Sequence, residues 1–292
     1  MIRSMLFVPG NSPAMLQNAD IHGADALILD LEDAVALKEK DSARALVKHA
    51  IKTLQFSGLP LIIRLNPLDS PFWEEDLLVM VPLGPAYLMP TKVSGPGDIA
   101  RISARVAEIE EQQDLPSGGV GLIPLIESAL GVEQAFQIAA SDPRVKGMLL
   151  GAEDLAHDLG AARSKAGNEI FYARGRMVMA ARACGLSVYD TPFTDVDDEA
   201  GLEADAAFAR GLGFDGKAAI SPRHIPAINQ AFSPTLSEIA QAKEVMAAIQ
   251  KAEAAGLGVV SLHGKMVDKP VVERAKKVLE AARKLGLEGE DE

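Results

Sequence analysis

The sequence predicts a (β/α)8 TIM barrel followed by a C-terminal helical lid. Short apolar runs, each followed by turn residues and a helical stretch, recur eight times between residues 5 and 222. Near-continuous apolar strands that alternate with helices are typical of a parallel sheet covered by helices. Eight such units in this length match a barrel. An open doubly wound sheet is the alternative, but no glycine-rich dinucleotide fingerprint follows the first run.

The predicted strands are the apolar runs themselves. In chain order they are MLFVPG (5–10), DALILDLED (25–33), PLIIRLNP (60–67), AYLMPTKV (86–93), VGLIPLIES (120–128), VKGMLLGAED (145–154), LSVYDTPF (186–193) and GKAAISP (216–222). The segments between them have helical spacing, as in DIARISARVAEIEEQQ, where apolar residues recur three and four apart. We therefore expect residues 1–228 to form the catalytic barrel domain.

The pattern changes in residues 229–292, which we expect to form a helix–loop–helix lid or an oligomer arm. The first helix is predicted at 233–256, where Ser233 is a suitable N-cap and Pro234 suits the first helical position. A short segment containing HGKMVDKP precedes a second predicted helix at 271–286. A barrel does not need such an appendage to close.

Composition limits the function classes. The chain has 292 residues, 48% of them hydrophobic, and a formal net charge of -12, which argues against general binding to nucleic acids or membranes. The single cysteine, Cys184, allows no internal disulfide. The first apolar run is too short for a signal peptide, and no apolar segment approaches the ~20 residues of a membrane span. We therefore expect a cytoplasmic protein.

Polar residues end several of the predicted strands. They are Glu32, Asp33, Arg64, Asn66, Lys92, Glu127, Glu153 and Asp154. Barrels carry their active sites at the carboxyl ends of the strands, so we expect these side chains to converge in one polar site. The planar guanidinium of Arg64 suits a substrate carboxylate.

The donor types indicate a hard cation. Carboxylate oxygens without a histidine or cysteine cluster suit Mg2+, with Mn2+ also possible. Glu127 together with one of Glu153 or Asp154 meets this need, since neighbours in a strand face opposite sides. A structural salt-bridge cluster is the alternative reading of the same residues.

Ordered motifs then indicate a family. RSMLFVPG, GADALILDLEDAV, IIRLNP, LIPLIES, GAEDLAHDLG, GFDGKAAISP, AFSPTLSEIAQAKEVMAAI and GKMVDKPVVERAKKVL occur in this order between residue 2 and about residue 285. Together they resemble the citrate lyase beta subunit-like family of the HpcH/HpaI aldolase superfamily, which is related to malyl-CoA and citramalyl-CoA lyases.

The resemblance implies a Mg2+-dependent carbon–carbon lyase with a defined site. Glu127 and Asp154 would hold the metal, and Arg64 would contact the keto acid. Glu32 and Asp33 would line the same cavity and hold metal-bound waters or orient Arg64. Lys92 aligns with a family lysine and is assigned to substrate binding.

The lid motif GKMVD implies a free CoA thioester as substrate rather than a carrier-protein thioester. Asp268 of this motif would reach the active site of a neighbouring subunit and act as acid/base. The resemblance therefore implies a homo-oligomer, either a trimer or a dimer of trimers.

The expected reaction cleaves a 3-hydroxyacyl-CoA of the citramalyl-CoA or malyl-CoA type to acetyl-CoA and pyruvate or glyoxylate. Two alternatives stay open. One is a malyl-CoA thioesterase or malate synthase-like activity on the same scaffold. The other is a non-catalytic subunit that binds a metabolite.

Three departures from the family pattern carry expectations of their own. Ser221 stands where relatives often have histidine, so we assign it no catalytic role. Thr91 stands before Lys92 in place of proline. No basic residue follows LFVPG, where relatives bind the CoA phosphates, so Arg3 or Lys38 would have to supply the cation.

Overall fold

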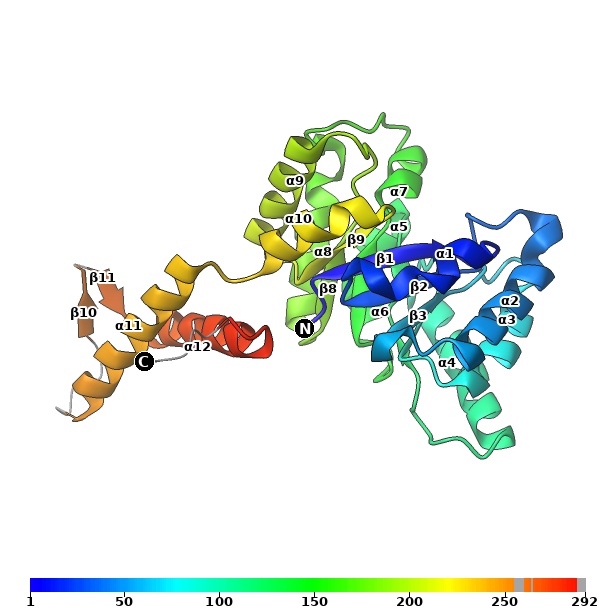
Figure 1. Cartoon of the computed structure of the whole chain (residues 1–292), viewed down its shortest axis with the longest axis horizontal. Coiled ribbons are helices and arrows are strands. Elements are labelled where there is room, and N and C mark those ends of the chain that lie inside the picture. Colours follow the sequence, from blue (N-terminus) through cyan, green and yellow to red (C-terminus); the bar gives the residue numbers. More distant parts are fainter. Residues whose placement is uncertain (255–259, 264, 288–292) are drawn as a thin grey trace. The chain divides into compact units, whose positions relative to one another are not determined.

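The computed structural model describes residues 1–254, 260–263 and 265–287 in two compact units (Figure 1). One unit is Ile2–Ala231, and the other is Phe232–Glu292 together with Met1. The assignment of residues 1–228 to a catalytic barrel and 229–292 to a lid stays a prediction. No helix of the described chain is both long and apolar enough to cross a membrane.

The first unit is built on one sheet whose strand pairs all run parallel. Its strands are β1 (Ser4–Pro9), β2 (Ala26–Asp30), β3 (Leu61–Arg64), β4 (Tyr87–Met89), β5 (Gly121–Leu122), β6 (Leu125–Ile126), β7 (Gly147–Leu150), β8 (Ser187–Asp190) and β9 (Gly216–Ala219). Each lies within one of the eight predicted runs, except that β1 begins one residue before the first run, and β5 and β6 share the fifth run. Pro124 separates these two because proline has no N–H to donate to the ladder.

Backbone hydrogen bonds close this sheet into a barrel. Strand β1 pairs with β2 on one side and with β9 on the other. The fifth run joins the remaining edges: the N–H of Ile123 donates to Leu88 O at 2.9 Å, and the N–H of Leu149 donates to Pro124 O at 3.0 Å. The predicted (β/α)8 barrel is thus confirmed, and the open doubly wound sheet is excluded.

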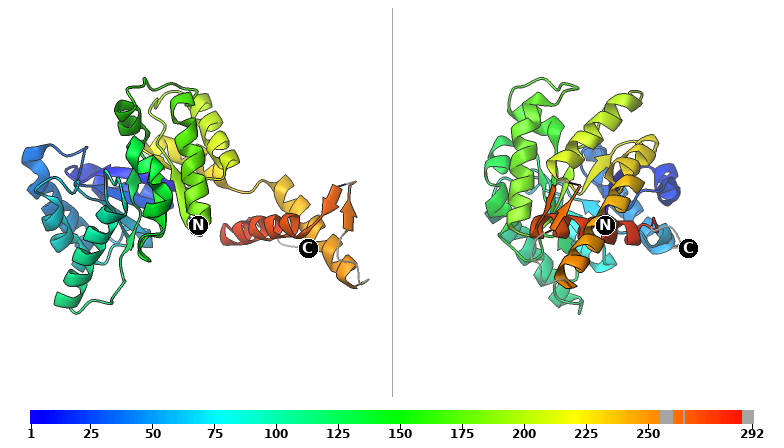
Figure 2. Two further views of the ribbon diagram at one scale, coloured as in Figure 1. Left: turned by 180° about the vertical axis from the view of Figure 1, so that it is seen from behind. Right: turned by 90° about the vertical axis from the view of Figure 1, so that its left-hand side faces the viewer.

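Helices cover the outside of the barrel, with α2–α4 and α8–α10 on opposite sides of the strands (Figure 1, Figure 2). They are α1 (Pro13–Gln17), α2 (Lys40–Thr53), α3 (Trp73–Met80), α4 (Pro96–Gln112), α5 (Ala129–Glu133), α6 (Ala135–Ala139), α7 (Ala152–Asp158), α8 (Phe171–Ala183), α9 (Glu199–Leu212) and α10 (Ile225–Phe232). Helix α2 shows why they form: Ala43, Val47 and Ala50 recur at helical spacing and are buried.

The barrel interior is a single apolar cluster to which every strand run contributes. Its buried members are Met5, Ala26, Ile28, Ile62, Met89, Ile123, Leu125, Leu149, Tyr189 and Ala218. Because side chains alternate along a strand, the residue two positions beyond each of these faces inward at the next level. The core therefore fixes which residues of each strand reach the carboxyl end of the barrel.

A buried ionic network fastens β8 and β9 to the helices outside them. Arg174 of α8 donates to Asp190 of β8 at 2.9 and 2.8 Å and to Asp205 of α9 at 2.7 Å. Lys217 of β9 is fully buried, and its Nζ lies 2.6 Å from Asp190 Oδ2, Asp205 Oδ2 and Thr191 O. Two cations and two carboxylates thus pair with one another in the barrel wall.

The second unit consists of two helices and a hairpin. They are α11 (Leu236–Ala254), β10 (Val260–Leu262), β11 (Lys265–Val267) and α12 (Lys269–Lys284). Apolar residues of α11 and α12, among them Val245 and Val272, form a small core with Val267. The two predicted helices are found, although residues 255–256 of the first lie outside the described residues. The short connection was expected as a loop, but β-branched residues in it support an antiparallel hairpin.

Removing one anion from the buried network is expected to destabilise the barrel. Asp190→Ala removes one of the two carboxylates that Arg174 and Lys217 share, and breaking a buried pair costs about 3–5 kcal/mol. Urea denaturation followed by circular dichroism measures this loss of unfolding free energy. The control is Asp197→Ala, which breaks an exposed pair with Arg223 and should cost less than about 1 kcal/mol. Equal losses in the two variants would contradict the assignment.

Candidate active site

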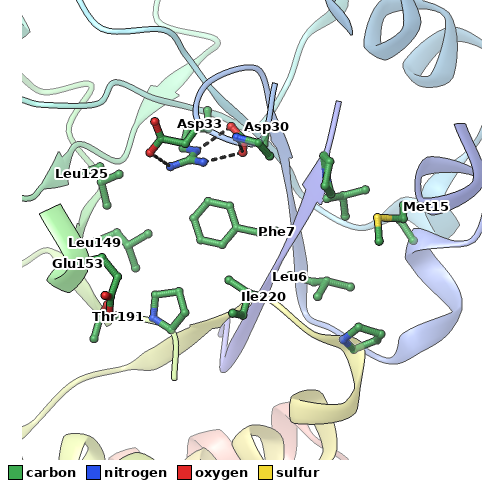
Figure 3. Close-up of a pocket in the computed structure, with 18 of the residues that line it drawn as sticks. Leu6, Phe7, Met15, Asp30, Asp33, Leu125, Leu149, Glu153, Thr191 and Ile220 are labelled. Carbon is green, nitrogen blue, oxygen red and sulfur yellow. Dashed lines mark hydrogen bonds and ion pairs between the residues drawn. The ribbon is translucent and has the colours of Figure 1, made fainter. Parts of the chain in front are cut away.

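A cavity of about 850 Å3 opens at the carboxyl ends of the barrel strands (Figure 3). Its wall includes residues from the ends of β1, β2, β3, β6, β7, β8 and β9. Five of the predicted site residues line it, namely Asp33, Arg64, Glu127, Glu153 and Asp154. Glu32 and Lys92 border this group without lining the cavity. The predicted convergence is therefore found for these seven residues, whereas Asn66 bonds Asp76 instead, and the expectation that Glu32 lines the cavity was wrong.

Strand alternation explains which side chains reach the cavity. Glu127 follows the core residue Leu125 by two positions, and Arg64 follows Ile62 in the same way. The same spacing places Phe7, Thr191 and Ile220 at this level, and these contribute an apolar wall that the sequence analysis did not predict. The sequence feature that could have predicted these wall residues is their place two positions beyond an inward-facing core residue, not their polarity.

Arg64 is held by a set of carboxylates. Its Nε and Nη2 donate to the two oxygens of Asp30 at 2.7 and 2.5 Å, and its Nη1 lies 3.0 Å from Glu32 and 3.6 Å from Asp33. The guanidinium also stacks over the Phe7 ring at 5.0 Å. Burial alone would lower the pKa of Arg64, but the carboxylates raise it overall, so the charge is permanent.

Asp30 is the site residue that the sequence analysis left without a role. It is 2% exposed and pairs in register with Arg64 across β2 and β3. Asp30 and Asp33 lie together beside the cavity in Figure 3. We had expected Glu32 and Asp33 to orient Arg64, yet the bidentate contact comes from Asp30 and Glu32 adds a single one. The inward alternation from Ile28 to Asp30 was the available signal.

Two carboxylates of this site are hard to ionise. Burial raises the pKa of Glu127 to about 8, with the nearby charges of Glu32 and Asp154 adding to the effect. Burial likewise raises the pKa of Glu32 to about 7, partly offset by Arg64. The site concentrates negative charge in a poorly hydrated place.

The position of Glu127 is tightly defined. Its Oε1 accepts a hydrogen bond of 2.8 Å from the backbone N–H of Lys92, whose φ of 54° lies in the left-handed region. Its Oε2 faces Gly151, where an added Cβ would lie 2.8 Å from that oxygen. Only glycine leaves room for the carboxylate here. The Nζ of Lys92 is 3.9 Å from Glu32.

Asp154 is the second carboxylate with a free approach to the cavity. It lies in the first turn of α7 and makes no hydrogen bond or ion pair with any residue that the structure describes. Glu153 also lines the cavity, so the expectation that only one of the two does so was wrong. Strand β7 ends at Leu150, and strand alternation does not apply to a helix. Glu153 instead pairs with Arg163 at 2.8 Å.

Three further residues considered from the sequence, Arg3, Lys38 and Ser221, do not line the cavity. Arg3 precedes β1 at the opposite end of the barrel and pairs with Asp25 at 2.8 Å, so its predicted contact with CoA phosphates is wrong. Lys38 is exposed on the 3-10 turn Leu37–Glu39. Ser221 accepts a hydrogen bond from the N–H of Arg223 at 3.3 Å and caps a short turn.

Asp268 lies in the second unit, directly before α12. Its side chain accepts a hydrogen bond of 3.1 Å from the N–H of Val271, which makes it the N-cap of this helix. The side chain is exposed. Its predicted role as acid/base stays a prediction.

Comparison with known proteins shows which family the chain belongs to. The family model described as HpcH/HpaI aldolase/citrate lyase matches residues 3–222. The chain belongs to this family. The resemblance inferred from the motifs is thereby confirmed.

Members of the HpcH/HpaI family with different names align along nearly the whole chain. Citrate lyase subunit beta of Leuconostoc mesenteroides subsp. cremoris is 42% identical over 280 residues, covering 96% of this chain and 93% of the relative. The L-malyl-CoA/beta-methylmalyl-CoA lyase of Rhodobacter capsulatus is 33% identical over 300 residues, with coverages of 96% and 94%. A (3S)-malyl-CoA thioesterase of Cereibacter sphaeroides is 36% identical over 280 residues, with the same coverages.

Among solved structures, the CitE protein of Mycobacterium tuberculosis in complex with magnesium, acetoacetate and coenzyme A superposes with a TM-score of 0.77. It is 30% identical, and the match covers 96% of this chain and 98% of that one.

The raised pKa of Glu127 predicts a pH-dependent stability for the metal-free protein. The folded chain holds the proton more tightly than the unfolded chain, whose glutamate has a pKa of about 4.5. The stability contribution is therefore full below about pH 4.5 and lost as pH rises through about 8, by up to about 1.4 kcal/mol per pH unit.

Urea denaturation in EDTA between about pH 5 and pH 9 measures this loss. Glu127→Gln serves as the control because its amide does not titrate, and its profile should be flatter over this range. Parallel profiles for the two proteins would show that Glu127 ionises normally in the fold.

Proposed function

We propose that the protein is a Mg2+-dependent lyase that cleaves the carbon–carbon bond of a 3-hydroxyacyl-CoA. The proposed substrates are of the citramalyl-CoA or malyl-CoA type, giving acetyl-CoA and pyruvate or glyoxylate. The observation that carries this proposal is the pair of carboxylates, Glu127 and Asp154, that line one cavity beside the fixed cation of Arg64. The names of the lyase relatives support the same reaction class.

The donor set fits a magnesium ion. Mg2+ is commonly bound through one or two carboxylates and keeps other positions for water and substrate. Glu127 keeps one oxygen toward Gly151, and Asp154 is unpaired within the described chain. The described residues include no cluster of three histidine, cysteine, aspartate or glutamate side chains arranged to hold a metal. Two protein ligands would therefore leave most of the coordination sphere to the substrate.

A divalent ion bound there would lower the pKa of the substrate hydroxyl and stabilise the ketone that forms from it. Arg64 would bind the carboxylate on the carbinol carbon through the second N–H of Nη1, since Nε and Nη2 already hold Asp30 and the other Nη1 proton is directed at Glu32. The Phe7 ring keeps one face of the guanidinium away from water. These contacts orient the bond that breaks.

The CoA part of the substrate would occupy a separate, mostly apolar arm of the cavity. Leu6, Val8, Met15 and Ile21 line this arm between β1 and the segment Pro13–His22. In Figure 3, Leu6 and Met15 lie to the right of the Phe7 ring, whereas Leu125, Leu149 and Glu153 lie to its left. The arm suits the aliphatic portion of a thioester.

Asp268 would complete the reaction by giving a proton to the thioester enolate, or by removing that proton in synthesis. We place it at the active site of a neighbouring subunit within a trimer or dimer of trimers, as the lid motif implies. The closed lid would exclude water and limit hydrolysis. Among the described residues that line the arm between β1 and Pro13–His22, His22 is the only basic one that could contact the CoA phosphates in place of Arg3.

Hydrolysis of the same thioester is the second candidate, favoured by the thioesterase relative. The test incubates the protein with citramalyl-CoA and malyl-CoA in the presence of Mg2+ and measures both products. Keto acid and acetyl-CoA in equal amounts support the lyase. Free CoA without acetyl-CoA supports the thioesterase, or condensation in the synthetic direction. No turnover of any thioester would favour a metabolite-binding subunit.

Loss of either carboxylate is expected to abolish tight metal binding. Glu127→Gln and Asp154→Asn each remove a charged ligand, so Mg2+ or Mn2+ affinity should fall by more than the 10- to 100-fold typical of outer-shell partners. Isothermal titration of the wild-type protein and the two variants measures this. Glu153→Gln is the matched control, because that side chain is committed to Arg163. An unchanged affinity in Glu127→Gln would remove the basis of the proposal.

Replacing Asp268 by asparagine separates its two roles. Asparagine caps a helix as well as aspartate does, so the fold of α12 is retained while the acid/base group is lost. We expect turnover to fall by about 10²- to 10⁴-fold and Mg2+ affinity to stay unchanged. Glu273→Gln, on the exposed face of the same helix, should turn over normally. Normal turnover of Asp268→Asn would leave Asp268 as a helix cap only.

A further inference from the structure

Helix α2 carries two buried basic residues one turn apart, Lys40 and Arg44. They are 6% and 5% exposed. A cation in such a place is costly unless its protons are bonded. The partners of Lys40 lie in the loop that leaves β2, whereas Arg44 bonds Asp41 of its own helix and Asp76 of α3, which in turn bonds the loop that leaves β3.

Lys40 binds the backbone of the first loop. Its Nζ donates to Leu31 O at 2.8 Å and to Glu32 O at 2.7 Å. These carbonyls follow Asp30 directly, and the side chain of Glu32 lies 3.0 Å from Arg64. The ammonium thus fixes the turn without neutralising its carboxylates by direct contact.

Arg44 holds the loop that leaves β3 indirectly, by binding Asp76. Its Nε donates to Asp76 Oδ1 at 2.8 Å. The other oxygen of Asp76 accepts from the backbone N–H and the Nδ2 of Asn66, at 3.1 and 2.7 Å. Asn66 stands two residues after Arg64, so α2 holds the backbone on both sides of the Arg64–Asp30 pair.

Lys40 has no direct access to substrate. It is not among the residues that line the cavity, and its ammonium is directed at two carbonyls. A lysine that formed a Schiff base with a keto acid would have to face the cavity as a neutral amine. Any effect of Lys40 on turnover must therefore pass through the loop that it holds.

We propose that Lys40 is a positioning residue that holds the 31–36 turn so that Glu32 keeps Arg64 aimed at the substrate carboxylate. The kinetic part of this proposal rests on the proposed lyase function. The structural part concerns only the turn itself.

The experiment compares Lys40→Met with Arg144→Met. Arg144 is a similarly buried cation, 8% exposed, and it donates to Glu110 at 2.8 Å near the amino end of the barrel. Both variants lose a buried cation, but only Lys40 contacts the active-site turn. Hydrogen exchange of residues 31–36 and steady-state kinetics are measured at a temperature where both variants are folded. Lys40→Arg, which keeps a donor cation, tests for rescue.

We expect Lys40→Met to speed amide exchange in residues 31–36 and to lower kcat/KM roughly 10- to 100-fold. Arg144→Met should change neither, and Lys40→Arg should recover part of both. Unchanged exchange in Lys40→Met, or equal losses of kcat/KM in Lys40→Met and Arg144→Met, would overturn the proposal. If the wild-type protein cleaves no thioester, the lyase function fails. Exchange and the affinity for glyoxylate with Mg2+ then decide the role of Lys40, with weaker binding in Lys40→Met expected and equal binding contradicting it.

Discussion

The structure of the barrel mouth depends on one electrostatic constraint: several carboxylates converge around one buried cation, Arg64, while Lys92 at the border is half exposed and 3.9 Å from Glu32. Asp30 takes two of the guanidinium's donors, and Glu32 takes a third. Among the described residues no cationic side chain pairs with Glu127, and burial raises its pKa to about 8. A bound divalent cation would relieve this excess of negative charge. The same imbalance therefore lowers the stability of the empty fold and favours binding of a metal.

The sequence was sufficient to predict the barrel because its strands are buried on both faces and read as continuous apolar runs. It also predicted that Arg64 and Glu127 reach the barrel mouth, since both end such runs and barrels carry their sites at the carboxyl ends of the strands. The sequence did not reveal the register in which the strands pair. Asp30 rather than Asp33 binds Arg64 with both oxygens because β2 pairs with β3 in a register that places Asp30 beside Arg64, and composition does not encode this pairing.

The sequence-based predictions were wrong where the chain passes from a strand to a helix. The run 145–154 was read as one strand, yet β7 ends at Leu150 and a helix starts at Ala152. The hydrogen bond of 3.1 Å from the Ala152 N–H to Thr191 Oγ1 helps to fix this start, and that contact joins residues 39 positions apart. Arg3 was misplaced for a related reason: a charge before a strand lies at the amino end of the barrel, away from the site.

Both sides of the cavity are held by lysines that bind backbone carbonyls from within the barrel wall. Lys40 holds the turn beside Arg64. On the other side Lys217 binds Thr191 O, and the Thr191 hydroxyl accepts the first N–H of α7, the helix that carries Asp154. A lysine placed inside the cavity would instead pair with the carboxylates and compete with a metal ion. Cations behind the wall supply rigidity and leave the acidic oxygens available, which is what a site that must exchange ligands requires.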